Sequence, residues 1–229
     1  MPTEVVRVAL PPPNRPIAPC FLEIPAGARL VRIFDPTRRN ATALTFRSYG
    51  PLKRFDHHRG QEPDRTPCDD PERAVYYAAW SGDLRQALSS CLVEVFGDTG
   101  FVEPGERLVA MPTVTRPLRL LDLCSRGAMR AGTVAAIAKC EYRLSQPWSR
   151  YFYETPDTYG LIDGLCYLNA HNDEPAILLY ERARDARQYT TANPICFEQS
   201  HPRPRRLSYN LGLSSHVDGE HALGMSLSL

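Results

Sequence analysis

The sequence predicts a single α+β domain in which a central mixed β-sheet is flanked by helices. The chain has 229 residues, of which 43% are hydrophobic, and this is enough for one substantial core. Strand-like stretches stand before and after a helical middle, an order typical of the α+β class. The sequence contains no internal repeat, so we expect one domain.

The first part of the chain predicts one strand between two irregular segments. Residues 1–27 are rich in proline, which favours an extended arm. Residues 29–34, "RLVRIF", form an apolar stretch between Gly27 and Pro36 and predict the strand. Residues 35–73 are polar and rich in Pro, Gly, Asp and Arg, and long ordered loops of this kind are often functional.

A strand over residues 74–80 and a helix over residues 81–98 are expected next. Asp83 can cap this helix, with Gln86 three residues further on in a capping-box arrangement. Apolar residues recur at the 3.6-residue spacing of a buried helical stripe, namely at Leu84, Ala87, Leu88, Cys91, Leu92 and Val95. Gly97 is expected to end the helix.

The second half of the chain predicts more strands and two helices. The expected elements are strands over residues 107–123 broken at Pro112 and Pro117, helices over 127–144 and 147–154, and closing strands over 162–168 and 176–183. A polar turn separates the two closing strands. After Arg184 the apolar pattern ends, which predicts a loosely packed extension over residues 185–229.

Charge and cysteine usage favour a soluble cytoplasmic protein. The formal net charge is +1, so no global basic field would hold a nucleic-acid backbone. The seven cysteines are dispersed among apolar residues, as expected for reduced thiols. The chain starts without the pattern of a signal peptide, and no apolar stretch approaches the roughly 18 residues of a membrane span. We therefore expect neither a membrane nor a nucleic acid as partner.

Several common catalytic motifs are missing from the sequence. It contains no G-x-G-x-x-G, no G-x-x-x-x-G-K-[ST], no G-x-S-x-G and no H-E-x-x-H. His57 and His58 could in principle bind a metal ion. However, adjacent histidines rarely reach the same ion, and no partner stands at metal-ligand spacing, so we expect no metal site.

Three charged residues are candidates for a functional site. Glu94 lies beside the apolar stripe of its helix, where a cleft could meet the core, although a surface glutamate paired with an arginine fits equally. Arg32 interrupts an apolar strand, and Arg54 follows the Gly50-Pro51 pair. Each arginine could instead be a solvated surface charge.

Aromatic and amide side chains complete the candidate set. Tyr76 and Tyr77 are neighbours in a strand, so their rings face opposite sides of the sheet, and one of them could stack on a flat heterocycle. Asn169, His171 and Asn172 in the polar turn offer hydrogen-bonding groups, or serve the turn alone.

Taken in order, these stretches resemble the successive blocks of the RES domain family. The blocks are "LVRIFD", "YGPLKRFDHH", "RAVYYAAW", "CLVEVFGD", "PLRLLDL", "QPWSRYFYE" and "IDGLCYLNAHND…AILLYERA". The resemblance covers about residues 28–184, between the arm of residues 1–27 and the extension of residues 185–229.

The resemblance implies a toxin of RES–Xre toxin–antitoxin systems. Such a protein would share the fold of ADP-ribosyltransferases and degrade NAD⁺ by cleaving the nicotinamide–ribose bond, through hydrolysis or phosphorolysis. NAD⁺ would be a substrate and inorganic phosphate a co-substrate of phosphorolysis, with no cofactor. The implied partner is an Xre-like antitoxin protein, and the expected assembly is either a homo-oligomer or a toxin–antitoxin complex.

The resemblance also implies roles for particular residues. Glu94 and Arg32 would be catalytic, and the substrate would be bound by Arg54, Tyr77, Tyr76 and Asn169. The two arginines would grip the diphosphate, and the carboxylate would stabilise the cationic ribose. Asn169 stands where the family has a serine. This departure leaves open a catalytically inactive binding module. An ADP-ribosyltransferase that modifies a macromolecule is a further alternative.

Overall fold

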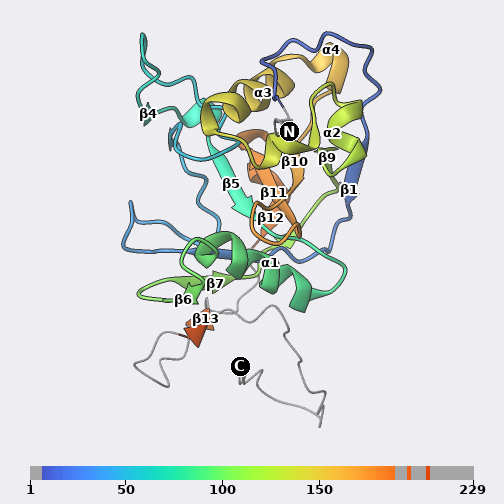
Figure 1. Ribbon diagram of the computed structural model, residues 1–229. Helices are drawn as coiled ribbons and strands as arrows, with labels where there is room; N and C mark the ends of the chain where they lie inside the picture. The colour runs from blue at the N-terminus through green and yellow to red at the C-terminus, as the bar shows by residue number, and fades with distance from the viewer. Residues whose placement is uncertain (1–6, 189–194, 197–204, 207–229) are drawn as a thin grey trace, which may run out of the picture.

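In a computed structural model, which describes residues 7–188, 195–196 and 205–206, the chain is organised around a five-stranded sheet (Figure 1). Its strand order is β1 (Phe21–Ile24), β9 (Leu118–Asp122), β10 (Gly164–Leu168), β11 (Pro175–Tyr180) and β5 (Val75–Ala78). Strands β9 and β10 are parallel, whereas the other neighbours are antiparallel. The sheet is therefore mixed, and the predicted α+β class is confirmed.

The central strands are apolar because both faces of the sheet are covered. In β10 and β11, Leu165 lies opposite Leu178, and Cys166 lies opposite Ile177. All four side chains are buried. Strands covered on both sides lose the alternation of apolar and polar residues. This explains why "GLCYL" and "AILLY" are nearly continuous apolar stretches.

Helices cover one face of the sheet. They are α2 (Arg126–Arg130), the 3₁₀ helix η2 (Ala135–Ala138), α3 (Tyr142–Glu154) and α4 (Pro156–Tyr159), gathered at the top of Figure 1. Trp148 and Phe152 of α3 belong to the core formed with Leu165 and Leu178. Burying each such side chain contributes about 1.5–3 kcal/mol. A second core, which includes Leu30, covers the opposite face of the large sheet.

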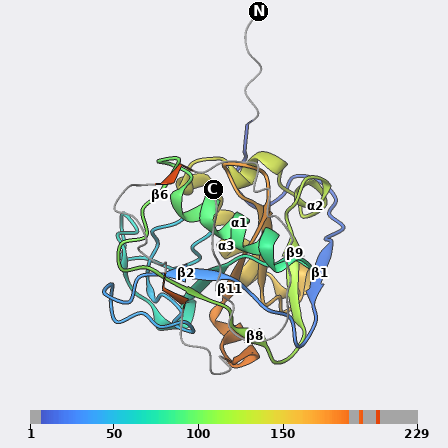
Figure 2. The same cartoon turned by 90° about the horizontal axis from the view of Figure 1, so that it is seen from below.

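Helix α1 (Leu84–Phe96) lies between the large sheet and a small one. The small sheet has the order β13 (Ile195–Cys196), β7 (Leu108–Ala110) and β2 (Arg32–Phe34). Figure 2, the view from below, shows α1 over the end of the large sheet with β2 nearby. The buried residues Leu88, Cys91 and Leu92 join Val31 and Val109 in one core.

The remaining elements are short. They are β3 (Tyr49–Gly50), β4 (Cys68–Asp69), β6 (Phe101–Val102), β8 (Thr113–Val114), β12 (Arg187–Gln188), β14 (Arg205–Arg206), and the 3₁₀ helices η1 (Pro71–Arg73) and η3 (Glu181–Ala186). Strand β3 pairs with β4, β12 with β8, and β14 with β6. The predicted long irregular segment therefore contains only two-residue strands and one turn of 3₁₀ helix.

Helix α1 begins and ends as predicted, with two differences in detail. The Asp83 side chain accepts a hydrogen bond from the backbone N–H of Arg85, which confirms the cap. Gln86 does not complete a capping box, because its side-chain oxygen accepts from the Ser81 hydroxyl instead. At the other end, Val95 is exposed and Phe96 is buried, so the apolar stripe shifts by one residue.

The prediction of one helix over residues 127–144 is wrong. Helix α2 ends at Arg130, and Gly132 has a φ of 98°, a left-handed conformation that interrupts helical geometry. The chain continues as η2 and then as α3, which also contains the separately predicted helix over 147–154. Pro147 lies inside α3 and does not end it.

The structure describes most of the N-terminal region and only a small part of the C-terminal region. Strand β1 lies within the predicted arm of residues 1–27 and pairs with β9 at the edge of the sheet. Most of the extension over residues 185–229 lies outside the described residues. Across the part of the chain that the structure describes, helices are too short or too polar to cross a membrane.

Candidate active site

Asp56 organises the loop "GPLKRFDHH", which covers residues 50–58 of the long irregular segment. Its side chain is fully buried. Both carboxylate oxygens accept from Nη2 of Arg47, at 2.6 and 2.7 Å, and the backbone N–H groups of Leu52 and Lys53 donate to Oδ2. Burial would raise the pKa of Asp56, but Arg47 and these hydrogen bonds outweigh burial and lower it. Asp56 is therefore held as a carboxylate.

The two histidines of this loop are buried in the core. Nε2 of His57 lies 3.0 Å from Oε2 of Glu181, and Nε2 of His58 lies 3.2 Å from the carbonyl oxygen of Arg47. A Cβ at Gly50 would lie only 2.5 Å from the His58 ring, so a glycine is required there. The loop is thus fixed by buried polar groups, and it presents Arg54 in a defined position.

Arg54 connects the loop to the region after η2. Its Nη1 donates a short hydrogen bond to the carbonyl oxygen of Cys140, and its guanidinium carbon lies 5.4 Å from the centre of the Tyr142 ring. Ser145 and Gln146 of α3 donate hydrogen bonds to the carbonyl oxygens of Arg54 and Lys53. Arg54 is therefore positioned by α3 as well as by its own loop.

Glu94 of helix α1 lies within electrostatic range of Arg54. The Tyr167 hydroxyl donates a long, weak hydrogen bond of 3.5 Å to Oε1 of Glu94. The side chain is exposed, yet surrounding protein atoms displace water from its carboxyl and raise its pKa, while His171 and then Arg54 lower it. The charge of Arg54 therefore acts on Glu94, and the Tyr167 hydroxyl contacts the Glu94 carboxylate.

Tyr167 is a site residue in addition to those predicted from the sequence. It is buried in β10, its ring lies 4.8 Å from that of Phe55, and its hydroxyl points to Glu94. Burial, and then the charge of Glu94, raise the pKa of Tyr167 well above its ordinary value, so it stays a neutral donor. The block "YLN" contained the signal, because Tyr167 is two residues before Asn169.

Tyr77 supports the loop that contains Arg54. Its hydroxyl donates to Oδ1 of Asp56 (2.9 Å) and accepts from the backbone N–H of Phe55 (3.2 Å). Its ring packs against the same core as Tyr167. Tyr77 thus lies on the Glu94 side of the sheet, and its hydroxyl is used in holding the loop.

Arg32 and Tyr76 lie on the opposite face of the sheet. Tyr76 is buried in the second core, and its hydroxyl donates to the carbonyl oxygen of Ala43. The guanidinium carbon of Arg32 lies 4.2 Å from the Tyr76 ring centre, and Nη1 donates to the carbonyl oxygen of Thr45. The structure therefore separates Arg32 from the group formed by Arg54, Tyr167 and Glu94.

Asn169 uses its side chain to close the turn between β10 and β11. Its Oδ1 accepts from the backbone N–H groups of His171 and Asn172, both at 3.0 Å, and its Nδ2 donates to Oδ1 of Asn172 at 2.6 Å. The residue is fully buried. The same turn packs on the end of α1, since a Cβ at Gly97 would lie 2.5 Å from the His171 ring.

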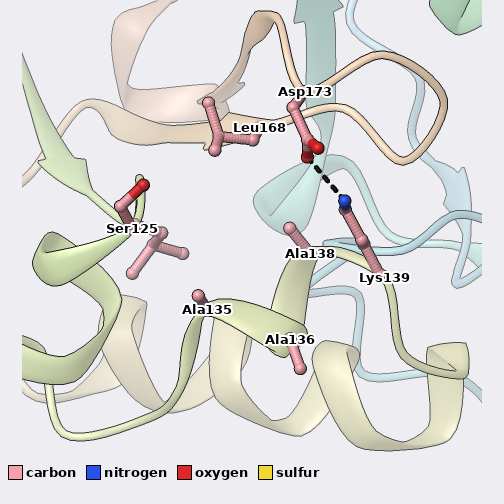
Figure 3. A pocket seen from close by; sticks show the side chains of 8 residues that line it. Ser125, Ala135, Ala136, Ala138, Lys139, Leu168 and Asp173 are labelled. Carbon is pink, nitrogen blue, oxygen red and sulfur yellow. Dashed lines mark ion pairs between the residues drawn. The ribbon is translucent and has the colours of Figure 1, made fainter.

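A cavity of about 460 Å³ lies where η2 approaches the ends of β9 and β10 (Figure 3). Its lining is mostly apolar and comes from the ends of β9 and β10, from η2 and from the β10–β11 turn. The residues are Leu123, Ser125, Ala135, Ala136, Ala138, Lys139, Leu168 and Asp173. Nζ of Lys139 and Oδ1 of Asp173 form an ion pair of 2.6 Å within this lining. Lys139 directly precedes Cys140, whose carbonyl oxygen accepts a hydrogen bond from Arg54. Leu168 directly follows Tyr167 in the sequence.

One group of side chains has the donor atoms for a thiophilic metal ion. The ligand atoms of Asp122, Cys124 and Cys166 all lie within 4.8 Å of one another, and the two sulfur atoms are 3.7 Å apart. Two sulfurs and a carboxylate suit Zn²⁺ by their chemistry. The dispersed cysteine spacing did not indicate this juxtaposition. The cysteines at positions 20, 68, 91, 124, 140 and 166 form no disulfide.

Comparison with known proteins places the chain in a family. The model of the RES domain matches residues 29–203. This match covers most of the chain, so the chain belongs to the RES domain family. The search of curated proteins and the search of solved structures give no match. The implied likeness to ADP-ribosyltransferases therefore stays a prediction.

Proposed function

We propose that this protein is an RES-type toxin that degrades NAD⁺ by cleaving the nicotinamide–ribose bond. The proposal draws on its membership of the RES domain family and on one observation of geometry. An exposed carboxylate, Glu94, contacts the hydroxyl of Tyr167 and lies within electrostatic range of Arg54, and a cavity with mostly apolar walls is lined by Leu168, the neighbour of Tyr167 in β10. Cavities of a few hundred Å³ are typical small-molecule sites.

Glu94 is the proposed catalytic carboxylate. Cleavage of the bond to nicotinamide develops positive charge on the ribose, while nicotinamide leaves as a neutral molecule. A nearby carboxylate stabilises that charge in the transition state more than in the ground state. Only the ionised form can do so. Burial raises the pKa of Glu94, and the charges of His171 and then of Arg54 oppose this shift and favour the ionised form.

Arg54 is the proposed contact to the diphosphate. A guanidinium binds phosphate oxygens through parallel hydrogen bonds. Tyr167 would orient the Glu94 carboxylate through its hydroxyl. Tyr77 would act indirectly, by holding the loop that contains Arg54. We propose no contact between Arg32 and the reacting ribose, because Arg32 lies on the other face of the sheet. Water or inorganic phosphate then attacks the ribose.

Product analysis tests this function directly. The purified chain is incubated with NAD⁺, with and without inorganic phosphate, and the products are separated by chromatography. Hydrolysis releases nicotinamide and free ADP-ribose, whereas phosphorolysis gives phosphorylated ADP-ribose only when phosphate is present. Transfer of the ADP-ribosyl group to an added protein or nucleic acid would instead identify a macromolecule-modifying enzyme.

A catalytically inactive binding module is the second candidate, and the Asn169 turn favours it. The asparagine stands in the place of the family serine, and its amide group is used within the turn. Asn169→Ser restores the family residue. An increase in NAD⁺ cleavage in this variant would indicate that the asparagine had weakened an active site, whereas no cleavage by either protein, with intact binding to an antitoxin, would favour the module.

The proposed partner is an Xre-like antitoxin, and the proposed location is the cytoplasm, where NAD⁺ is available. Both follow from the implied role as a toxin and rest on no contact in the structure. Coexpression with the neighbouring reading frame tests them. We expect the chain alone to arrest growth and the neighbour to restore it, and growth unaffected by the chain alone would contradict the role as a toxin.

A further inference from the structure

Asp122 and Cys166 lie side by side on one face of the large sheet, where the parallel strands β9 and β10 are paired. The two residues are direct partners in the strand register. Cys166 belongs to the second core together with Leu120, whereas Tyr167 belongs to the core on the other face. Because alternate residues of a strand share a face, Asp122 lies on the same side as Leu120. The Asp122–Cys166 pair is therefore on the face opposite to Tyr167.

The turn after β9 brings a second thiol to the same place. Cys124 packs against the second core, and its Sγ lies 3.7 Å from Sγ of Cys166. The backbone N–H of Cys124 also donates to Oδ1 of Asp122, at 2.8 Å. The carboxylate and the two sulfur atoms all lie within 4.8 Å of one another. Because the two cysteines stand 42 positions apart, no local motif in the sequence reveals this cluster.

The Asp122 carboxylate is held in place but has no cationic partner within the described part of the chain. The ion pairs among the described residues do not include it. The start of α2 lies against it, since a Cβ at Gly127 would be 2.9 Å from Oδ2. Asp122 and Cys124 are half-buried, and Cys166 is buried. A cation could therefore reach the cluster from the side of the turn.

We propose that Asp122, Cys124 and Cys166 bind a zinc ion that ties the β9–α2 turn to β10. Zn²⁺ is tetrahedral in such sites with Zn–S bonds of about 2.3 Å, so two sulfur ligands lie about 3.8 Å apart. The observed separation of 3.7 Å matches this value, whereas a disulfide would need about 2.05 Å. Binding replaces the two thiol protons, which pass to solvent, and the fourth position is left for water. This site does not depend on the chemistry proposed for Glu94.

Metal titration of the full chain tests the site. The chain is reduced, freed of metal with a chelator and titrated with Zn²⁺ in competition with a chromophoric chelator. We expect a zinc site in the wild type and at least a tenfold loss of affinity in Cys124→Ser and in Asp122→Asn. The control is Cys68→Ser, because Cys68 is a half-buried free thiol in β4, which pairs with β3 in a separate sheet. It should keep the wild-type affinity.

Cobalt gives a second measurement, because Co²⁺ in a zinc site reports its ligands by its spectrum. Sulfur-to-cobalt charge-transfer bands and strong tetrahedral d–d bands are expected in the wild type and in Cys68→Ser, and their loss is expected in Cys124→Ser. If neither site variant folds, the cobalt spectrum of the wild type and of Cys68→Ser decides, and weak octahedral bands without sulfur charge transfer would overturn the proposal. It is also overturned if the reduced chain takes up no zinc, or if the affinity is the same in the wild type and the site variants.

Discussion

At the scale of single residues, Asp56 determines where Arg54 lies. Its carboxylate binds Arg47, two backbone N–H groups and the Tyr77 hydroxyl, all within the first half of the chain. In the sequence, the arginine and the histidines of this loop are the evident candidates, and the aspartate does not stand out. Spacing along the chain does not reveal a buried carboxylate whose partners lie 9 and 21 residues away.

Replacing Asp56 should destabilise the whole domain. Asp56→Asn removes the charge that compensates Arg47 and leaves buried donors without an acceptor, at a cost of about 3 kcal/mol. Urea denaturation measures the free energy of unfolding. Asp64→Asn, at an exposed position, is the control and should change it by less than about 0.5 kcal/mol. Equal stability of the two variants would contradict the role of Asp56.

His57 predicts how stability depends on pH. Burial lowers the pKa of His57 from 6.5 to about 4 despite its contact with Glu181. The unfolded chain therefore binds a proton at a higher pH than the folded chain does, and the free energy of unfolding falls as the pH is lowered from 6.5 to 4. The loss approaches about 3 kcal/mol. Urea denaturation at several pH values should show a smaller loss in His57→Gln, and identical pH profiles would refute this assignment.

At the scale of secondary structure, strands and one helix could be predicted, but broken helices could not. The sequence predicts the strands β5, β10 and β11 and the cap of α1, because these features depend on periodicity and on neighbouring residues. The division into α2, η2 and α3 depends on Gly132 and on tertiary packing. Proline at position 147 likewise suggested a boundary that packing of α3 on the core overrides.

The contact between α1 and the β10–β11 turn predicts that a methyl group added at Gly97 lowers the stability of the fold. A Cβ at Gly97 would lie 2.5 Å from both the His171 ring and the Val93 carbonyl oxygen, so Gly97→Ala should displace the turn and cost about 1–3 kcal/mol. Gly82→Ala is the matched control, because no atom lies within 4 Å of a Cβ there. Thermal unfolding compares the two variants. An equally stable Gly97→Ala protein would show that this contact is not tight.

At the scale of the whole molecule, the fold class and the family were accessible from the ordered blocks, whereas the geometry of the site was not. From the sequence we expect Arg32, Arg54 and Glu94 to share one pocket. In the structure, Arg54 lies within electrostatic range of Glu94. Arg32 lies on the opposite face of the sheet, where both it and Arg187 contact the Tyr76 ring. Linear order could not settle this, because neighbouring strand residues face opposite sides and α1 lies across the end of the sheet.

The rate of nicotinamide release from NAD⁺ by the wild-type chain and by Glu94→Gln tests the central claim most directly. Glutamine keeps the size of the side chain and removes its charge, so loss of transition-state stabilisation should slow release by about 100-fold or more. Glu103→Gln, at an exposed position outside the site, should release nicotinamide at the wild-type rate. Equal rates in the wild type and in a folded Glu94→Gln protein would contradict the account.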